Sequence, residues 1–273
     1  MPDPRTVTLA EVRATLDAAY PPALAEDWDT GIGLTCGDPA QPVGTVLLAV
    51  DVDPVTVDEA VEVGADLLLT HHPLLFRPVQ SVAADTAKGR LIHRLIRGGV
   101  AHLAAHTNAD RAAGGVNDAL AAALGLTDTR PVAPADADPA LGLGRIGTLA
   151  APTTARAFAA AIAAALPATV TGARLAGDPD RRIRRVAVCG GSGGSLLSTV
   201  SGAGVDAFVT SDLGHHVAQE YVSGGDDRPV LVDVAHWAGE WPWLPVAAAL
   251  LERELGVRAV VSERRTDPWT ARA

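Results

Sequence analysis

The stretch Ala65-Asp66-Leu67-Leu68-Leu69-Thr70-His71-His72-Pro73 is the feature around which the rest of the chain is arranged. Its apolar run, Leu67 to Leu69, is typical of a buried strand, and Pro73 prevents the strand from continuing. Neighbouring side chains of an extended backbone point to opposite sides, so His71 and His72 are poorly placed to hold one ion together. We expect each of them to bind one of two metal ions about 3.5–4 Å apart.

The bulk composition excludes several classes of protein. The chain has 273 residues, of which 48% are hydrophobic and 20% charged, as expected for one large or two smaller globular domains. A net charge of −10 argues against unspecific binding to nucleic acid or to an anionic membrane. The two cysteines, Cys36 and Cys189, lack the spacing of a zinc ribbon or a disulfide framework. Residues 1–5 lack the apolar segment of a signal peptide, so we expect a cytoplasmic protein without a membrane anchor.

The order of predicted elements indicates an α/β fold. Strands are predicted at 45–52, 65–70 and 100–105, and helices at 54–63 and 85–98 lie between them. Residues 127–142, rich in Pro, Asp and Ala, are expected to be a domain boundary. The later pattern predicts strands at 145–149, 169–175, 185–189, 205–210 and 229–234, and a long helix at 236–255.

A weak internal repeat divides the chain into two halves. Val63–Thr70 resembles Ala203–Thr210, and a His-His pair follows each segment within a few residues. We therefore predict two related α/β halves with largely parallel or mixed sheets flanked by helices. The first domain, 1–126 plus 232–273, is expected to carry the metal ligands. Residues 127–231 are expected to form the second domain, and the metal site is expected in the cleft between the halves.

The candidate metal ligands all follow predicted strands, where ligands of open α/β sheets collect. His71, His72, His106 and His236 follow strand ends, and Asp110 and Glu240 lie four residues after His106 and His236. In a helix, that spacing places both members of a pair on one face. Taken singly, each histidine could instead be a capping or core residue, which is our interpretation of His93 and His102.

The number and type of these ligands suit two metal ions. Four histidines and two carboxylates exceed the tetrahedral shell of one zinc ion, and one carboxylate can bridge two ions. Imidazole and carboxylate together favour zinc, iron, manganese, cobalt or nickel over calcium or magnesium. We therefore predict two divalent transition-metal ions.

The chain resembles the Nif-three-like family, the dinuclear-metal proteins named GTP cyclohydrolase type 2 homologues. The motifs that carry the resemblance are Trp28–Leu34, Thr70–Pro73, His106–Asp110, Gly114–Asn117, Gly190–Gly193, Thr210–Asp212 with His215-His216, and His236–Glu240. The resemblance implies two α/β domains, a toroidal hexamer, and two metals held by the six ligands named above. Ser211 and Thr30 depart from the family pattern, in which Gly and Asn are usual.

Two hypotheses about function follow. The first is a metal-dependent hydrolase, in which two metals lower the pKa of a water molecule and His215 or His216 transfers the proton. The resemblance implies hydrolytic opening of the purine ring of GTP, and a phosphoester or another nucleotide-derived molecule is a rival substrate, which would make the protein a phosphoesterase. The second is a non-catalytic metal-binding assembly that acts in metal handling or partner binding. Gly190–Ser195 could bind an anion through its backbone or could be only a tight strand-to-helix turn.

Overall fold

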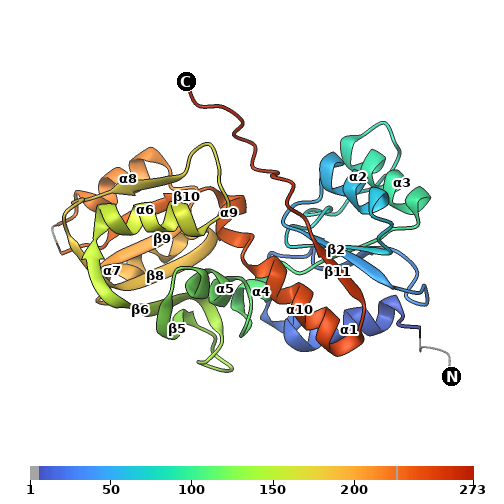
Figure 1. The fold of residues 1–273 in the computed structure, drawn as a ribbon, viewed down its shortest axis with the longest axis horizontal. Helices are drawn as coiled ribbons and strands as arrows, with labels where there is room; N and C mark the ends of the chain where they lie inside the picture. Colours follow the sequence, from blue (N-terminus) through green and yellow to red (C-terminus); the bar gives the residue numbers. More distant parts are fainter. Residues whose placement is uncertain (1–5, 226) are drawn as a thin grey trace. The chain divides into compact units, whose positions relative to one another are not determined.

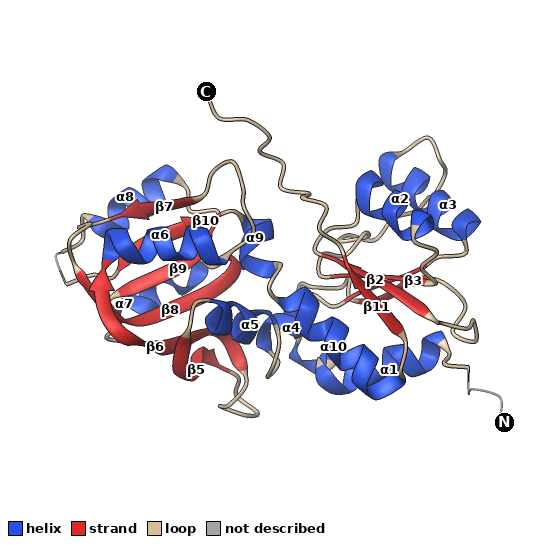
Figure 2. Ribbon diagram, viewed as in Figure 1, coloured by secondary structure: helices blue, strands red, loops and turns tan. Residues whose placement is uncertain are grey.

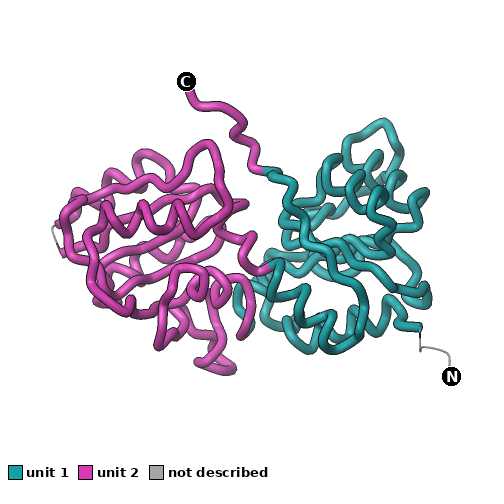
Figure 3. The backbone as a smooth tube through the Cα atoms, in the orientation of Figure 1, with its two compact units in different colours: residues 1–112, 244–266 teal, residues 113–243, 267–273 magenta. Residues whose placement is uncertain are grey.

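The computed structural model of the chain describes residues 6–225 and 227–273, so residues 1–5, on which the signal-peptide argument rests, lie outside the described residues. The chain divides into two compact units (Figure 3). Unit 1 comprises Met1–Ala112 and Leu244–Thr266, and unit 2 comprises Ala113–Trp243 and Asp267–Ala273. This division assigns His236 and Glu240 to unit 2.

Unit 1 is built on a five-stranded sheet in the order β1-β4-β3-β2-β11. Its strands are β1 (Gly33–Cys36), β2 (Thr45–Ala49), β3 (Leu67–Thr70), β4 (Ala101–Ala104) and β11 (Arg258–Val261). All neighbouring strands are parallel except β1, which pairs with β4 in the antiparallel sense. Strand β3 is buried along its whole length because both faces of a parallel sheet are covered by helices.

Helices cover both faces of the unit 1 sheet, as Figures 1 and 2 show. Helices α2 (Pro54–Glu62) and α3 (Ala87–Gly98) lie on one face, where Val57, Ala60, Ile92 and Leu95 form a core with Leu47 and Leu68. Helices α1 (Leu9–Ala19) and α10 (Trp243–Leu255) lie on the other face. The short elements η1 (Pro22–Leu24) and α4 (Thr107–Arg111) complete this unit.

Unit 2 is built on a six-stranded mixed sheet in the order β5-β6-β8-β9-β10-β7. Its strands are β5 (Leu126–Pro134), β6 (Gly142–Thr154), β7 (Ala173–Ala176), β8 (Arg182–Ser192), β9 (Ala207–Ser211) and β10 (Val230–Val234). Strands β8, β9 and β10 are parallel, and the outer pairs are antiparallel. The flanking helices are α5 (Val116–Ala123), α6 (Ala155–Ala165), η2 (Gly194–Leu196), α7 (Leu197–Ser201), α8 (His215–Val222) and α9 (His236–Glu240). The predicted fold class, two α/β halves with mixed sheets flanked by helices, is confirmed.

The two segments of the internal repeat share their local structure. Gly64 and Gly204 both have a φ of +65°, which favours glycine. The Asp66 carboxylate accepts hydrogen bonds from the backbone amides of residues 44 and 45, and the Asp206 carboxylate accepts them from residues 184 and 185. In both units an aspartate thus ties the start of one parallel strand to the start of its neighbour.

Two local predictions were wrong. The first half of the expected boundary at 127–142 belongs to strand β5, which lies at an edge of its sheet, where prolines are tolerated because no ladder bond is lost. The expected long helix at 236–255 is divided into α9 and α10, and Pro242 lies between them. Proline lacks the amide hydrogen that a continuous helix would need there, so the chain ends one helix and starts another.

Candidate metal centre

Neighbouring strand ends bring three candidate histidines together in unit 1. Strands β3 and β4 are parallel and in register at Thr70 and Ala104, so the residues that follow them emerge at the same edge of the sheet. One ligand atom from each of His71, His72 and His106 lies within 4.8 Å of the other two. These three side chains could hold a metal ion, as expected from the sequence.

The Nδ1 atom of each of these histidines faces an oxygen acceptor. His71 Nδ1 lies 2.9 Å from the carbonyl oxygen of Ala105, and His72 Nδ1 lies 2.7 Å from Oδ1 of Asp51. His106 Nδ1 lies 3.0 Å from Oδ2 of Asp29. Because an acceptor requires the proton on Nδ1, a neutral ring keeps its lone pair on Nε2, which is then the atom available to a metal.

Asp29 is the most strongly bonded of these acceptors. Its Oδ2 also accepts a 3.1 Å hydrogen bond from the Thr107 amide and a 2.6 Å bond from the Thr107 hydroxyl. Burial raises the pKa of Asp29, but the hydrogen bonds from His106 and Thr107 outweigh it and hold this pKa at about 2. Asp29 is therefore ionised at neutral pH and fixes both the ring of His106 and the start of α4.

Asp110 adds a carboxylate to the three histidines. It lies in the short helix α4, four residues after the N-cap residue His106, and its amide donates a 3.1 Å hydrogen bond to the His106 carbonyl oxygen. Its Oδ1 is 3.7 Å from Nε2 of His71. Unit 1 thus brings together four of the six predicted ligands.

A buried hydrogen-bond chain supports the backbone of His72. The Thr70 hydroxyl donates a 2.6 Å bond to the carbonyl oxygen of His72 and lies 2.9 Å from Nε2 of His102. Since the hydroxyl proton is used in the first bond, Nε2 of His102 must donate the second. His102 is fully buried, and burial lowers its pKa from 6.5 to about 3. It is a core residue, as the sequence indicated.

The remaining two predicted ligands lie together in unit 2. His236 and Glu240 are separated by one turn of α9, and His236 Nε2 is 2.8 Å from Glu240 Oε1. The Nδ1 atom of His236 lies 2.6 Å from Oδ2 of Asp212, which has a positive φ of 61° at the end of β9. The backbone of Gly191 approaches the pair so closely that a Cβ there would collide with Glu240 Oε1 and lie 3.0 Å from His236 Nε2.

Sequence reasoning missed the aspartates that orient these ligands. Asp29, Asp51 and Asp212 each bond the Nδ1 atom of a histidine, and none has a fixed spacing to it. Asp29 and Asp212 lie within two of the motifs that carry the family resemblance, Trp28–Leu34 and Thr210–Asp212, but the sequence analysis gave them no role. The acids that gather around Trp28 were a further signal for Asp29.

The predicted proton-transfer histidines, His215 and His216, are exposed at the start of α8. Their ring centroids are 5.2 Å apart, and His215 lines a pocket of about 430 Å³ with Arg174, Gln219 and Asp233.

The Gly190–Ser195 run donates hydrogen bonds within the protein through two of its backbone amides. The Gly190 amide donates to Asn117 Oδ1, and the Gly193 amide donates to Thr210 Oγ1. These bonds favour the interpretation of the run as a strand-to-helix turn.

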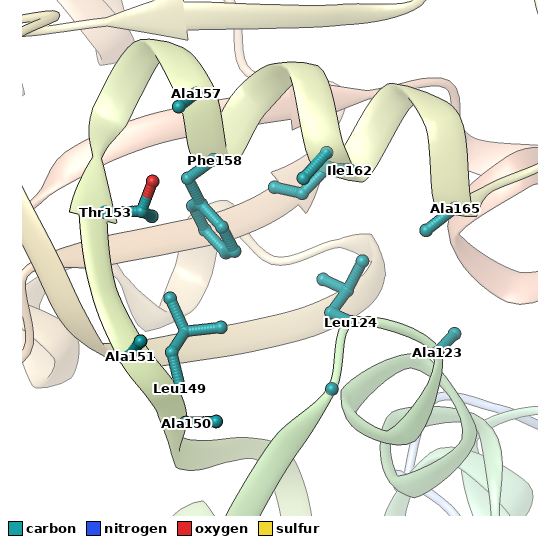
Figure 4. Close-up of a pocket in the computed structure, with 12 residues that line it drawn as sticks. Ala123, Leu124, Leu149, Ala150, Ala151, Thr153, Ala157, Phe158, Ile162 and Ala165 are labelled. Carbon is teal, nitrogen blue, oxygen red and sulfur yellow. The ribbon is translucent and has the colours of Figure 1, made fainter.

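A further pocket in unit 2 offers no acid–base chemistry. It has a volume of about 480 Å³ and lies between α6, β6 and the end of α5 (Figure 4). Its walls include Phe158, Ile162, Leu149 and Leu124, and the only side-chain oxygen among its lining residues belongs to Thr153. None of the lining residues is titratable, so this pocket cannot supply a general acid or base.

Comparisons with known proteins agree with the resemblance seen in the motifs. The profile of the family described as Duf34/NIF3 (NGG1p interacting factor 3) matches residues 7–268. A Streptomyces coelicolor protein named GTP cyclohydrolase 1 type 2 homolog is 50% identical over 270 residues, which cover 96% of this chain and 94% of the relative. A Mycobacterium tuberculosis protein of the same name is 39% identical over 372 aligned residues, with 97% of each chain covered.

Solved structures show the same fold. A Bacillus cereus protein related to NIF3 has a TM-score of 0.89 and 28% identity, with 97% of this chain and 99% of that chain covered. The Staphylococcus aureus protein SA1388 has a TM-score of 0.88 and 27% identity, with 98% of this chain and 99% of that chain covered.

None of the helices in the described part of the chain combines the length and the apolar character that crossing a bilayer requires.

Proposed function

The chain belongs to the Duf34/NIF3 family, and we propose that it is a dinuclear-metal-dependent hydrolase that acts on a nucleotide-like small molecule. One observation carries the metal-binding part of this proposal. All four candidate histidine ligands bond an oxygen acceptor through Nδ1, from Ala105, Asp51, Asp29 and Asp212. Acceptors of this kind typically orient metal-binding histidines and set their tautomer, so that Nε2 is left for the ion.

The donor set fits two divalent transition-metal ions. The proposed ligands are His71, His72, His106 and Asp110 of unit 1 with His236 and Glu240 of unit 2. Imidazole nitrogen and carboxylate oxygen suit zinc, iron, manganese, cobalt or nickel. When bound, two such ions would supply Lewis acidity and lower the pKa of a coordinated water molecule.

The surroundings of His236 support a cation at that position. Its two ring nitrogens both face carboxylate oxygens, Nδ1 that of Asp212 and Nε2 that of Glu240. A neutral imidazole carries one N–H and can donate to only one of them. A divalent ion held by Nε2 and Glu240 would take the place of a second proton and balance the charge of the carboxylate.

The chain's own residues would perform the remaining tasks. Asp29 and Asp51 hold the ligand rings in place through Nδ1, and Gly191 leaves room for Glu240. His215 or His216, which are both exposed, would transfer a proton during hydrolysis. The relatives' name, GTP cyclohydrolase 1 type 2 homolog, makes GTP the first substrate to test. We expect the reaction to take place in the cytoplasm.

Metal content and turnover of the purified protein test the proposal. Elemental analysis should approach two ions per chain after reconstitution, and a ratio that stays near one would contradict the dinuclear site. Glu240→Gln should weaken both sites if Glu240 bridges the ions, whereas His71→Ala should deplete mainly one. Hydrolysis of GTP or another nucleotide that a chelator abolishes and added metal restores would support the enzyme. Metal-dependent capture of a partner without any turnover would instead support the non-catalytic assembly.

A further inference from the structure

Two exposed aromatic side chains lie beside the three histidines of unit 1. Trp28 is 57% exposed and Phe76 is 37% exposed, and their ring centroids are 5.8 Å apart. Both rings meet His106 edge to face, at centroid distances of 6.1 Å for Trp28 and 6.0 Å for Phe76. Single exposed apolar residues are common on protein surfaces and need no explanation. Two exposed aromatic rings that contact each other and a candidate metal ligand do need one.

The loops that carry these rings are anchored. Trp28 directly precedes Asp29, whose carboxylate bonds His106 and Thr107. The Glu26 amide donates a 3.0 Å bond to the Thr107 hydroxyl, which ties the same loop to the start of α4. Phe76 follows the His71-His72-Pro73 turn, and Gly31 packs so closely on that turn that a Cβ would lie 2.8 Å from Pro73. These contacts anchor the backbone close to both aromatic residues.

The geometry of the pair decides how a ligand can bind. The planes of Trp28 and Phe76 are tilted by 54° at a centroid distance of 5.8 Å. A third ring does not fit between them, because stacking needs about 3.5 Å on each face. Trp28 keeps 57% of its surface exposed, so a planar ring has room to stack on Trp28 outside the pair, and Phe76 and His106 both lie within about 6 Å of the Trp28 ring.

We propose that Trp28 and Phe76 form a stacking site for a planar heteroaromatic ring, such as a nucleobase, beside the metal centre. The proposal rests on the proposed function in placing the ring next to the metals, and it names the part of the substrate that is recognised. Stacking on an aromatic side chain accepts any flat π-system, so it binds a base without hydrogen bonds to its edges. A second copy of the chain seated on the same rings would instead cover the neighbours of His106 and block access for a small molecule.

Calorimetric titration of the zinc-reconstituted protein with two probes tests the proposal. Ribose 5-phosphate carries a hydroxyl group where guanosine 5′-monophosphate carries its base, so the guanosine compound should bind at least tenfold more tightly. Trp28→Leu should remove most of this difference in affinity. Trp28→Phe keeps an aromatic ring, so its affinity ratio for the two probes should stay within about threefold of the wild-type ratio. The matched control is Trp269→Leu, because Trp269 is 65% exposed but belongs to unit 2; its binding should equal that of the wild type.

Several results would overturn the stacking site. The first is equal affinity of the wild type for the two probes, and the second is no binding of the guanosine compound. The third is a Trp28→Leu variant that binds the guanosine compound as tightly as the wild type does. If Trp28→Leu fails to fold or loses zinc, Phe76→Leu decides by the same criterion. A lower mass of Trp28→Leu in light scattering, without any ring binding by the wild type, would assign the rings to a contact between copies. Ring binding that persists in a protein without a two-metal site or turnover would refute the proposed function but leave the stacking site intact.

Discussion

Asp29 links a loop before the first strand to the candidate ligand His106, which lies 77 residues further along the chain. Its carboxylate fixes the Nδ1 side of His106 and accepts both hydrogen bonds of Thr107. Removing such an acceptor usually lowers the metal affinity of the histidine by 10- to 100-fold, because the ring loses its orientation and basicity.

We therefore expect Asp29→Asn to weaken metal binding by about tenfold or more. Competition with a chromophoric chelator measures the effect. Asp27→Asn is the matched control, because Asp27 carries the same charge in the same loop but is exposed. Equal loss of affinity in both variants would show that the charge of the loop matters and the orientation of His106 does not.

The buried ring of His102 should make the stability of the protein depend on pH. Its pKa in the folded protein is about 3, below its ordinary value of 6.5, because it is buried as a neutral ring. Between pH 3 and pH 6.5 His102 is protonated in the unfolded chain but not in the folded chain. The free energy of unfolding therefore falls as the pH falls from about 6.5 towards 3. The slope from this one group reaches at most about 1.4 kcal/mol per pH unit.

The His102→Phe variant lacks this group, so its stability should fall less steeply over the same range. Urea denaturation of both proteins at pH 7, 6 and 5 measures the difference in the free energy of unfolding. The difference between wild type and variant should shift in favour of the variant as the pH falls. A difference that is the same at every pH would show that His102 does not resist protonation in the folded protein.

At the scale of elements, strand β8 and helix α9 approach so closely that only glycine fits at residue 191. Gly191 has a φ of +67°, and a Cβ there would meet Glu240 Oε1 and His236 Nε2. We expect Gly191→Ala to cost about 1–3 kcal/mol and to displace both ligands, so that metal content falls.

Gly204→Ala separates strain from displacement. Gly204 has nearly the same φ, +65°, but the nearest atom to its Cβ position is Arg185 Nη1 at 3.6 Å. This variant should lose stability by a similar backbone strain and keep its metal. Thermal melting and elemental analysis of both variants provide the comparison, and metal loss from Gly204→Ala would show that general destabilisation is the cause.

At the scale of the whole molecule, the proposed metals would connect ligands that lie far apart in the sequence. Ions that bind only the folded state stabilise it by about 2.7 kcal/mol at a hundredfold excess over the dissociation constant. Chelation should therefore lower the melting temperature and increase hydrogen exchange first at residues 236–244, which begin with His236 and include Glu240. Unchanged protection of these residues after metal removal would mean that packing alone holds them.

We also predict that the chain assembles as a hexamer. The resemblance to the Nif-three-like family motivates this prediction. Multi-angle light scattering should give a mass near six times the 27.9 kDa of one chain. A stable particle of the mass of a single chain would contradict it.

The sequence by itself determined the fold class and the identity of the candidate ligands. The apolar runs before His71, His106 and His236 have the length of buried strands, and strands β3, β4 and β10 lie there. The spacing of four residues from His236 to Glu240 predicts a shared helical face, and α9 provides it. The same spacing from His106 to Asp110 runs from the N-cap of α4 into that helix. These features are local, because strand and helix periods act over a few residues.

Only the tertiary structure decided which groups orient the ligands and where the chain changes element. Asp29 and Asp51 reach their histidines across 77 and 21 residues, and Asp212 lies 24 residues before His236, so no short-range spacing marks them. The proline-rich segment after residue 126 became strand β5 because an edge position of the sheet tolerates proline. In both cases the deciding interaction is made by a partner that is distant in sequence, so the local periods of strands and helices do not predict it.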